Sequence, residues 1–260
     1  MTHLLHQPVD EWASRTPDRE AIRCGEDSLT YARLSESSDR LAQVLVRRGV
    51  RRGDRVGIYL DKGLNAAVSL YGIMKAGAAY VPLDPHAPAT RLAYILRDCD
   101  IRVLVTDDSK LTVLEEISDD VPGLECLVGT ECAAGTGQDS ISWAEVQDAP
   151  PGRPAMNAVE KDLSYILYTS GSTGVPKGVV HTHRSALAWA EASTAAFGFR
   201  QDDRISNYAP LHFDLSTLDY FSTALAGGTT VVIPELVTKL PASLSDLIAR
   251  ERLTVFYTVP

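Results

Sequence analysis

The sequence predicts an α/β fold made of two lobes, each with a largely parallel sheet flanked by helices. The first observation is an alternation along the chain, because short runs rich in β-branched residues take turns with helical segments. The second is that these short runs are apolar throughout, as parallel strands buried on both faces should be. The third is a stretch rich in Gly, Pro and Ala between residues 129 and 162, which we interpret as a surface connection between the lobes.

The first predicted lobe comprises residues 1–160. Its first clear helical segment, 41–49, stops at Gly49, a residue type that suits a helix C-terminus. The same reasoning predicts the following elements in order: strand 55–60, helix 64–77, strand 79–84, helix 91–100 and strand 101–107.

The second predicted lobe, residues 161–260, opens with strand 163–169, a glycine-rich loop and helix 185–197. Further strands are predicted at 205–210, 229–234 and 254–260, and helices at 214–225 and 242–252. A buried strand that ends at Pro260 normally leads into more chain, so we interpret the sequence as the front part of a longer fold.

Composition narrows the functional class. The chain has 34 acidic against 25 basic residues and a net charge of −9, which disfavours nucleic acids and anionic membranes as partners. No signal peptide is seen, and no apolar run approaches the about 20 residues of a membrane span. The four cysteines form no C-x-x-C pair and no zinc-ligand cluster. We therefore expect reduced thiols, no metal ligands and a cytoplasmic location.

The most informative segment is YTSGSTGVPKG, residues 168–178, directly after an apolar strand. Its three glycines allow backbone N–H groups to turn toward an anion, while four Ser and Thr hydroxyls and Lys177 add donors. Pro176 stands where a Walker A loop needs glycine, and the dinucleotide pattern G-x-G-x-x-G is also absent. The segment therefore predicts a phosphate cradle of another kind.

This loop resembles the signature of the adenylate-forming superfamily, which includes acyl-CoA synthetases, luciferases and nonribosomal-peptide adenylation domains. Three further segments resemble motifs of that superfamily in the same order: LTYARL (29–34), KAGAAYVPLDP (75–85) and HFDLS (212–216). The resemblance covers essentially the whole chain. The KAGAAYVPLDP segment is apolar and is interpreted mostly as scaffold.

The resemblance implies binding of ATP with Mg²⁺ and attack of a substrate carboxylate on the α-phosphorus. Catalytic roles fall on Thr169 and Lys177, and metal ligands are expected mainly beyond residue 260. The implied phosphate-contacting residues are Thr169, Ser170, Gly171, Ser172, Thr173, Gly174 and Lys177. His181 and His183 lack a third ligand for a metal, and the match favours a structural role for both.

The HFDLS segment indicates the substrate class. A carboxylate beside apolar residues suits a substrate with an ammonium group near its own carboxylate, and the resemblance assigns that role to Asp214. The alternative is that Asp214 caps the helix that follows. Phe213, or the adjacent His212, is implied to lie near the substrate carboxylate.

The resemblance to the superfamily also places Leu215 and Leu218 in the substrate pocket. Together with Asp214 they describe a small apolar pocket that is similar to the one in prolyl–carrier-protein ligases, so proline is favoured, while other small aliphatic or β-amino acids stay open. The expected reaction forms an aminoacyl-AMP and pyrophosphate, then a thioester on the phosphopantetheine of a carrier protein. Free CoA as acceptor stays open.

Members of the superfamily are roughly twice as long as this sequence, because they consist of two domains. The C-terminal catalytic domain, with its catalytic lysine, is absent from this sequence. We expect residues 1–260 alone to bind ATP weakly and to turn over nothing. The alternatives are an acyl- or aryl-CoA ligase, which Asp214 disfavours, and a non-catalytic nucleotide-binding module.

Overall fold

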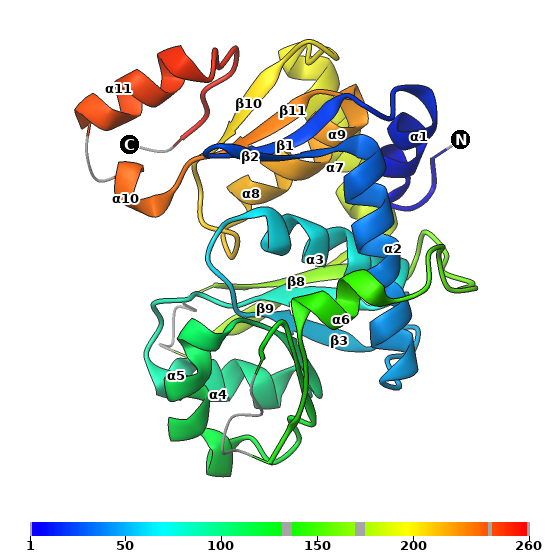
Figure 1. The fold of residues 1–260 in the computed structure, drawn as a ribbon, viewed down its shortest axis with the longest axis vertical. Coiled ribbons are helices and arrows are strands. Elements are labelled where there is room, and N and C mark those ends of the chain that lie inside the picture. The colour runs from blue at the N-terminus through cyan, green and yellow to red at the C-terminus, as the bar shows by residue number, and fades with distance from the viewer. Residues whose placement is uncertain (1, 132–136, 170–174, 239–240, 259–260) are drawn as a thin grey trace.

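The computed structural model, shown in Figure 1, describes residues 2–131, 137–169, 175–238 and 241–258. Helices flank two separate β-sheets, so the predicted α/β fold with largely parallel sheets is confirmed. No helix in these four ranges is both long and apolar enough to cross a membrane.

The larger sheet has seven strands, and all neighbours are parallel except the last pair. Its order is β7 (Asp139–Ile141), β6 (Cys126–Val128), β5 (Val103–Val105), β3 (Arg55–Ile58), β4 (Ala79–Pro82), β8 (Leu163–Thr169) and β9 (Lys177–Thr182).

The smaller sheet has four strands in the order β10 (Arg204–Asn207), β11 (Thr229–Val232), β1 (Glu20–Cys24) and β2 (Asp27–Thr30). β1 pairs in parallel with β11, and β8 pairs in parallel with β4. Each sheet thus combines strands from before and after residue 160. The lobe boundary expected near residue 160 therefore does not separate the two sheets. In both sheets a strand that precedes residue 160 pairs with a strand that follows it.

The helices lie on both faces of the sheets (Figure 1). Their bounds are α1 (Gln7–Arg15), α2 (Tyr31–Arg47), α3 (Leu64–Lys75), α4 (Ala89–Asp98), α5 (Leu111–Glu116), α6 (Trp143–Asp148), α7 (His183–Phe197), α8 (Leu215–Thr217), α9 (Thr223–Ala226), α10 (Glu235–Thr238) and α11 (Pro241–Arg250). Short 3₁₀ turns span Asp108–Lys110 and Ser118–Asp120.

Helix α3 is the centre of the molecule. It packs against β3 and β4 of the larger sheet and against β1 of the smaller one, and every residue from Ala66 to Lys75 is buried. A helix that is apolar on all sides is stable only when all of its faces are covered. Gly72 allows α2 to approach closely, since a Cβ there would lie 2.8 Å from a Leu41 methyl carbon.

One charged residue of α3 is buried at its C-terminal end. The Lys75 ammonium is 0% exposed and lies 2.8 Å from both Asp10 and Asp39. Arg153 pairs with the same two carboxylates. Although burial raises the pKa of Asp10, hydrogen bonding to His6 and the nearby positive charges hold it well below its usual range. The buried charge is therefore compensated, as stability requires.

Several predicted elements differ from the observed ones. The 129–162 connection contains β7 and α6, whose Ser142 forms a capping box with Glu145. The glycine-rich loop is followed by strand β9 rather than directly by a helix. In both cases the sequence did not predict a short element, because three to six residues carry too little hydrophobic periodicity to be recognised.

The last predicted strand, 254–260, is reduced in its described part to a single bridge between Ile205 and Val255. The predicted helix 214–225 is interrupted by a π-helical turn, Leu218–Ser222, between α8 and α9. Side-chain hydroxyls of Thr230 and Tyr71 donate hydrogen bonds to two carbonyls of this turn, those of Asp219 and Tyr220. Tertiary contacts therefore stabilise a geometry that local sequence does not favour.

The buried His183 at the start of α7 makes stability depend on pH. Its Nδ1 accepts a hydrogen bond from the Leu5 N–H at 3.1 Å, and burial lowers the pKa of His183 to about 4. The unfolded chain, with a histidine pKa near 6.5, binds more protons between pH 6.5 and 4. Acidification through that window therefore destabilises the fold, by about 2 to 3 kcal/mol at pH 4.5.

Urea unfolding at pH 7 and pH 4.5 checks this expectation. His183→Asn keeps an acceptor for the Leu5 N–H but removes the titratable ring, so its loss on acidification should be smaller than that of wild type. An equal loss in both proteins would show that His183 does not control the acid sensitivity.

Candidate active site

The glycine-rich loop is closed at its base by the β8–β9 hairpin. Thr169 and Lys177 are paired directly across the two strands, so the ends of the loop are held together. β8 is mostly buried, whereas β9 is largely exposed. The predicted phosphate-contacting residues Ser170, Gly171, Ser172, Thr173 and Gly174 lie outside the described residues.

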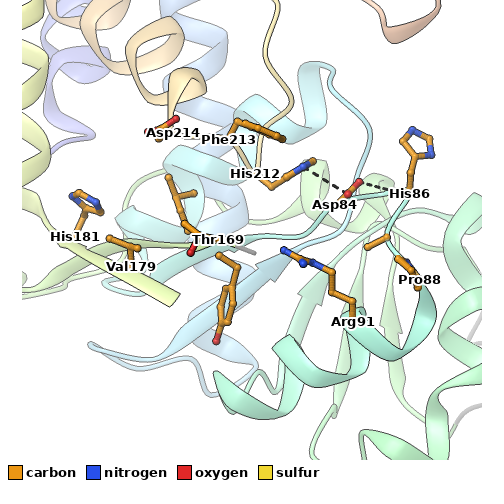
Figure 2. Close-up of a pocket in the computed structure, with 13 residues that line it drawn as sticks. Asp84, His86, Pro88, Arg91, Thr169, Val179, His181, His212, Phe213 and Asp214 are labelled. Carbon is orange, nitrogen blue, oxygen red and sulfur yellow. Dashed lines mark hydrogen bonds and ion pairs between the residues drawn. The ribbon is translucent and has the colours of Figure 1, made fainter. Parts of the chain in front are cut away.

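A cleft of about 610 Å³ opens beside this hairpin, and Figure 2 shows its lining residues. Thr169 lies at its base, and Arg91 extends into it from the first turn of α4. The loop before α8 contributes His212, Phe213 and Asp214. The structure thus brings Thr169 together with these three predicted substrate residues in one cleft, while Lys177 is at the hairpin base but is not one of its lining residues.

His212 is held against the loop that follows β4. Its Nε2 lies 3.7 Å from the Asp84 carboxylate, and burial lowers the pKa of His212 although Asp84 opposes the shift. Its Nδ1 is buried and has no hydrogen-bond partner in the part of the chain that the structure describes. The neighbouring Phe213 ring is 51% exposed, and its centroid is 4.9 Å from that of His212. The two rings therefore form one wall of the cleft, with Phe213 facing solvent.

Asp214 occupies the N-cap position of α8, but its side chain makes no capping hydrogen bond. Among the described residues, the hydrogen bonds to Asp214 go to its backbone carbonyl, from the Thr217 N–H at 3.0 Å and from the Thr217 hydroxyl. The carboxylate is exposed at the cleft surface. The cap interpretation therefore finds no support in the geometry, and the carboxylate is available to a ligand.

A second, smaller cavity of about 270 Å³ adjoins the cleft. Leu215 and Leu218, both predicted pocket residues, line it together with Asp214. Its other walls are Tyr165, Leu167, His181, Trp189, Thr217 and Tyr257. The cavity is thus an apolar and aromatic pocket with one carboxylate at its opening.

Sequence reasoning did not find the aromatic walls of this pocket. Tyr165 and His181 face each other across β8 and β9, with ring centroids 4.7 Å apart and nearly parallel planes. Recognising a hairpin around the loop would have placed them together. Trp189 of α7 and Tyr257 near the C-terminus reach the pocket only through tertiary folding, and no local pattern marks them.

The two histidines of β9 and α7 differ in their surroundings. His183 is buried beneath the N-terminal segment, in agreement with the structural role expected for it. His181 lines both the cleft and the smaller cavity. The sequence around His181 contains no pattern that predicts this position.

Among the described residues, one group could hold a metal ion: Asp61, His86 and Glu235, whose ligand atoms lie within 4.8 Å of one another. All three are exposed, and Asp61 already pairs with the Lys110 ammonium at 3.0 Å. Asp61 and Glu235 do not line the 610 Å³ cleft. The group therefore does not fit a metal that assists chemistry beside Thr169.

Two adjoining cavities thus lie beside the β8–β9 hairpin, near the carboxyl ends of parallel strands, where open α/β folds bind their ligands. The chain belongs to the AMP-binding enzyme family, whose model matches residues 9–260. This confirms the resemblance that the sequence motifs indicated.

Curated relatives agree with this assignment. The chain is 34% identical to tyrocidine synthase 3 of Brevibacillus parabrevis, over 98% of this chain and 4% of that protein. It is 31% identical to the L-proline–[L-prolyl-carrier protein] ligase of Pseudomonas fluorescens, over 99% of this chain and 50% of the relative. The chain therefore spans half or less of the length of these relatives.

Solved structures show the same fold. The anthranilate CoA ligase AuaEII, in complex with anthranoyl-AMP, superposes with a TM-score of 0.89 at 25% identity, over 98% of this chain and 48% of that one. The nonribosomal peptide synthetase FmoA3 gives a TM-score of 0.82 at 29% identity, over 97% of this chain and 25% of that one.

The free carboxylate of Asp214 leads to a prediction about stability. Asp214→Ala removes no capping hydrogen bond, so the free energy of unfolding should change by less than about 0.5 kcal/mol. The matched control is Thr182→Ala, which deletes a real capping box at α7 and should cost about 1 kcal/mol. Urea denaturation measures both, and a loss for Asp214→Ala as large as the control's would restore the cap interpretation.

Proposed function

We propose that this protein activates an amino acid with ATP, forming an aminoacyl-AMP and pyrophosphate, and then passes the acyl group to a carrier-protein thiol, forming a thioester and releasing AMP. The observation that carries the proposal is the position of Asp214. Its unengaged carboxylate lies where the cleft beside the glycine-rich loop meets the small apolar pocket. A substrate that spans this junction would have an ammonium group beside Asp214, its carboxylate in the cleft and its side chain in the pocket.

ATP would bind along the cleft with its phosphates at the glycine-rich loop. Thr169 and Lys177, at the base of that loop, are the proposed catalytic donors, and residues 170–174 are proposed to add backbone and hydroxyl donors. An AMPPNP-bound form of FmoA3 is among the similar structures. In the proposed step a substrate carboxylate oxygen bonds to the α-phosphorus, and the bond from that phosphorus to the pyrophosphate oxygen breaks.

Aligned donors would lower the cost of bringing these negative oxygens together. We propose Mg²⁺ as the partner of ATP but assign it no ligand in this chain, because the one described cluster lies away from Thr169.

The pocket favours a small or cyclic aliphatic amino acid. Leu215 and Leu218 contribute apolar side chains to its lining, which would suit an aliphatic substrate side chain. Phe213 and His212, which wall the cleft next to Asp214, would lie near the substrate carboxylate. Among candidates we favour proline, supported by the prolyl-carrier-protein ligase among the relatives.

The acceptor is proposed to be the phosphopantetheine thiol of a carrier protein. The L-proline–[L-prolyl-carrier protein] ligase among the relatives supports that class of partner. We place the reaction in the cytoplasm. The 260-residue chain by itself is expected to support little turnover, since these relatives are at least about twice as long.

A second candidate is an aryl- or acyl-CoA ligase, which the similarity to AuaEII favours. Both candidates share the adenylation step. They differ in the acid that is accepted, because a carboxylate at the pocket opening attracts an ammonium group, whereas an acid without an amine would leave that carboxylate desolvated and unpaired.

ATP–pyrophosphate exchange on the complete gene product separates the two. The panel is proline, glycine, alanine, a β-amino acid and benzoate. We expect exchange with one amino acid, and Asp214→Ala should lower its kcat/KM about 100-fold, the typical loss for a hydrogen bond to a charged group.

The matched control is Asp148→Ala, which removes an exposed carboxylate on α6 that lines neither cavity. It should leave exchange unchanged. Exchange with benzoate alone, or activity indifferent to Asp214, would favour the CoA ligase.

A further inference from the structure

His181 lies at the boundary between the two cavities. Of the described residues, Leu167, His181 and Asp214 are the ones that line both the 610 Å³ cleft and the 270 Å³ pocket. Leu167 is a buried residue of β8, whereas His181 stands on the exposed strand β9. Figure 2 shows His181 and Asp214 at the same end of the cleft, away from His86 and Arg91.

The imidazole of His181 is held in place by stacking. Its ring lies nearly parallel to that of Tyr165, with 4.7 Å between the centroids and 23° between the planes. Tyr165 in turn is buried and packs against Tyr80 and Phe221. A side chain stacked on such a rigid cluster has a defined position, so it can limit the size of what passes beside it.

We propose that His181 is a specificity-determining residue, whose ring restricts the groups on the α- and β-carbons of the substrate. The inference rests on the proposed function, in which the substrate amine is at Asp214, its carboxylate in the cleft and its side chain in the pocket. The α-carbon of such a substrate passes through the junction that His181 borders. The ring would therefore contact the substrate at its α-carbon, where the amine, the carboxylate and the side chain are joined.

The charge of His181 matters as well as its size. The titratable groups that face it around the pocket are Asp214, from the loop before α8, Tyr165 of β8 and Tyr257. On the cleft side the charged and titratable groups are Arg91, Asp84, His86 and His212, with Tyr168.

Burial lowers the pKa of His181, although Asp214 opposes the shift, and burial raises the pKa of Tyr165 to about 12. At neutral pH the ring and the phenol are uncharged, which leaves the Asp214 carboxylate to the substrate ammonium. A protonated His181 would place a like charge beside that ammonium.

Exchange assays on the complete gene product, with glycine, alanine, proline, valine and phenylalanine, test the steric role. His181→Ala should raise kcat/KM for the two largest substrates at least about tenfold relative to the smallest, in the range that one or two methylene groups are worth in a pocket. His181→Phe keeps a ring for stacking on Tyr165 and should keep the wild-type order of substrates. The matched control, Val180→Ala, alters the same strand at an exposed residue that lines neither cavity, and should also keep that order.

The pH dependence tests the role of charge. Burial holds the pKa of His181 below the usual 6.5, so the wild-type KM for the amino acid should rise progressively as the pH is lowered below 6.5 and the ring gains a proton. His181→Phe should show a flatter profile for the amino acid. The melting temperature of each variant is measured as a check on folding. If His181→Ala has a lowered melting temperature, His181→Val, whose side chain suits a strand, repeats the steric test.

The outcomes separate this inference from the proposed function. Wild-type exchange with an unchanged order of substrates in His181→Ala and His181→Val would overturn the role of His181 and leave the proposed function standing. Absence of exchange with every amino acid in wild type would overturn both. Broadened specificity in the alanine variant, with the phenylalanine variant like wild type, is the result that we expect.

Discussion

The burial of α3 on all sides is the constraint on which the rest of the structure depends. The helix is covered by the larger sheet on one side and by the smaller sheet on another, so neither sheet can be displaced without exposing an apolar surface. Its one charged residue at the buried end, Lys75, is neutralised by Asp10 and Asp39. Helices α1 and α2, which carry these two carboxylates, are thereby tied to α3.

This arrangement explains why the site forms where it does. β4 and β8 of the larger sheet and β10 of the smaller one all lead toward the cleft, because Asp84, Thr169 and His212 follow or end these strands. Ligands of open α/β sheets bind beyond the carboxyl ends of the strands. With two sheets fixed on one helix, the cleft receives Thr169 from the larger sheet and the Asp214 carboxylate from the segment that follows β10 of the smaller sheet.

The sequence predicted the parts of the protein that local pattern determines. Helix 64–77 and strand 55–60 carry strong periodicity, and the glycine-rich segment 168–178 is specific enough to identify the family. The exchange of strands between the sheets could not be predicted, because β1 pairs with β11 across about 200 residues of sequence. Trp189 of α7 and Tyr257 come together only through tertiary packing, whereas Leu215 and Leu218 were found because the resemblance to the adenylate-forming superfamily places them in the pocket.

The central claim is that the Asp214 carboxylate binds the ammonium group of the substrate, and a binding measurement tests it without any turnover. Calorimetry would compare a non-hydrolysable analogue of the aminoacyl adenylate with its des-amino counterpart, in the complete wild-type protein and in Asp214→Ala. The account predicts that loss of the amine weakens wild-type binding by about 30-fold or more and that of the variant by no more than about threefold. An equal loss in both proteins would contradict it, because the amine would then be recognised elsewhere.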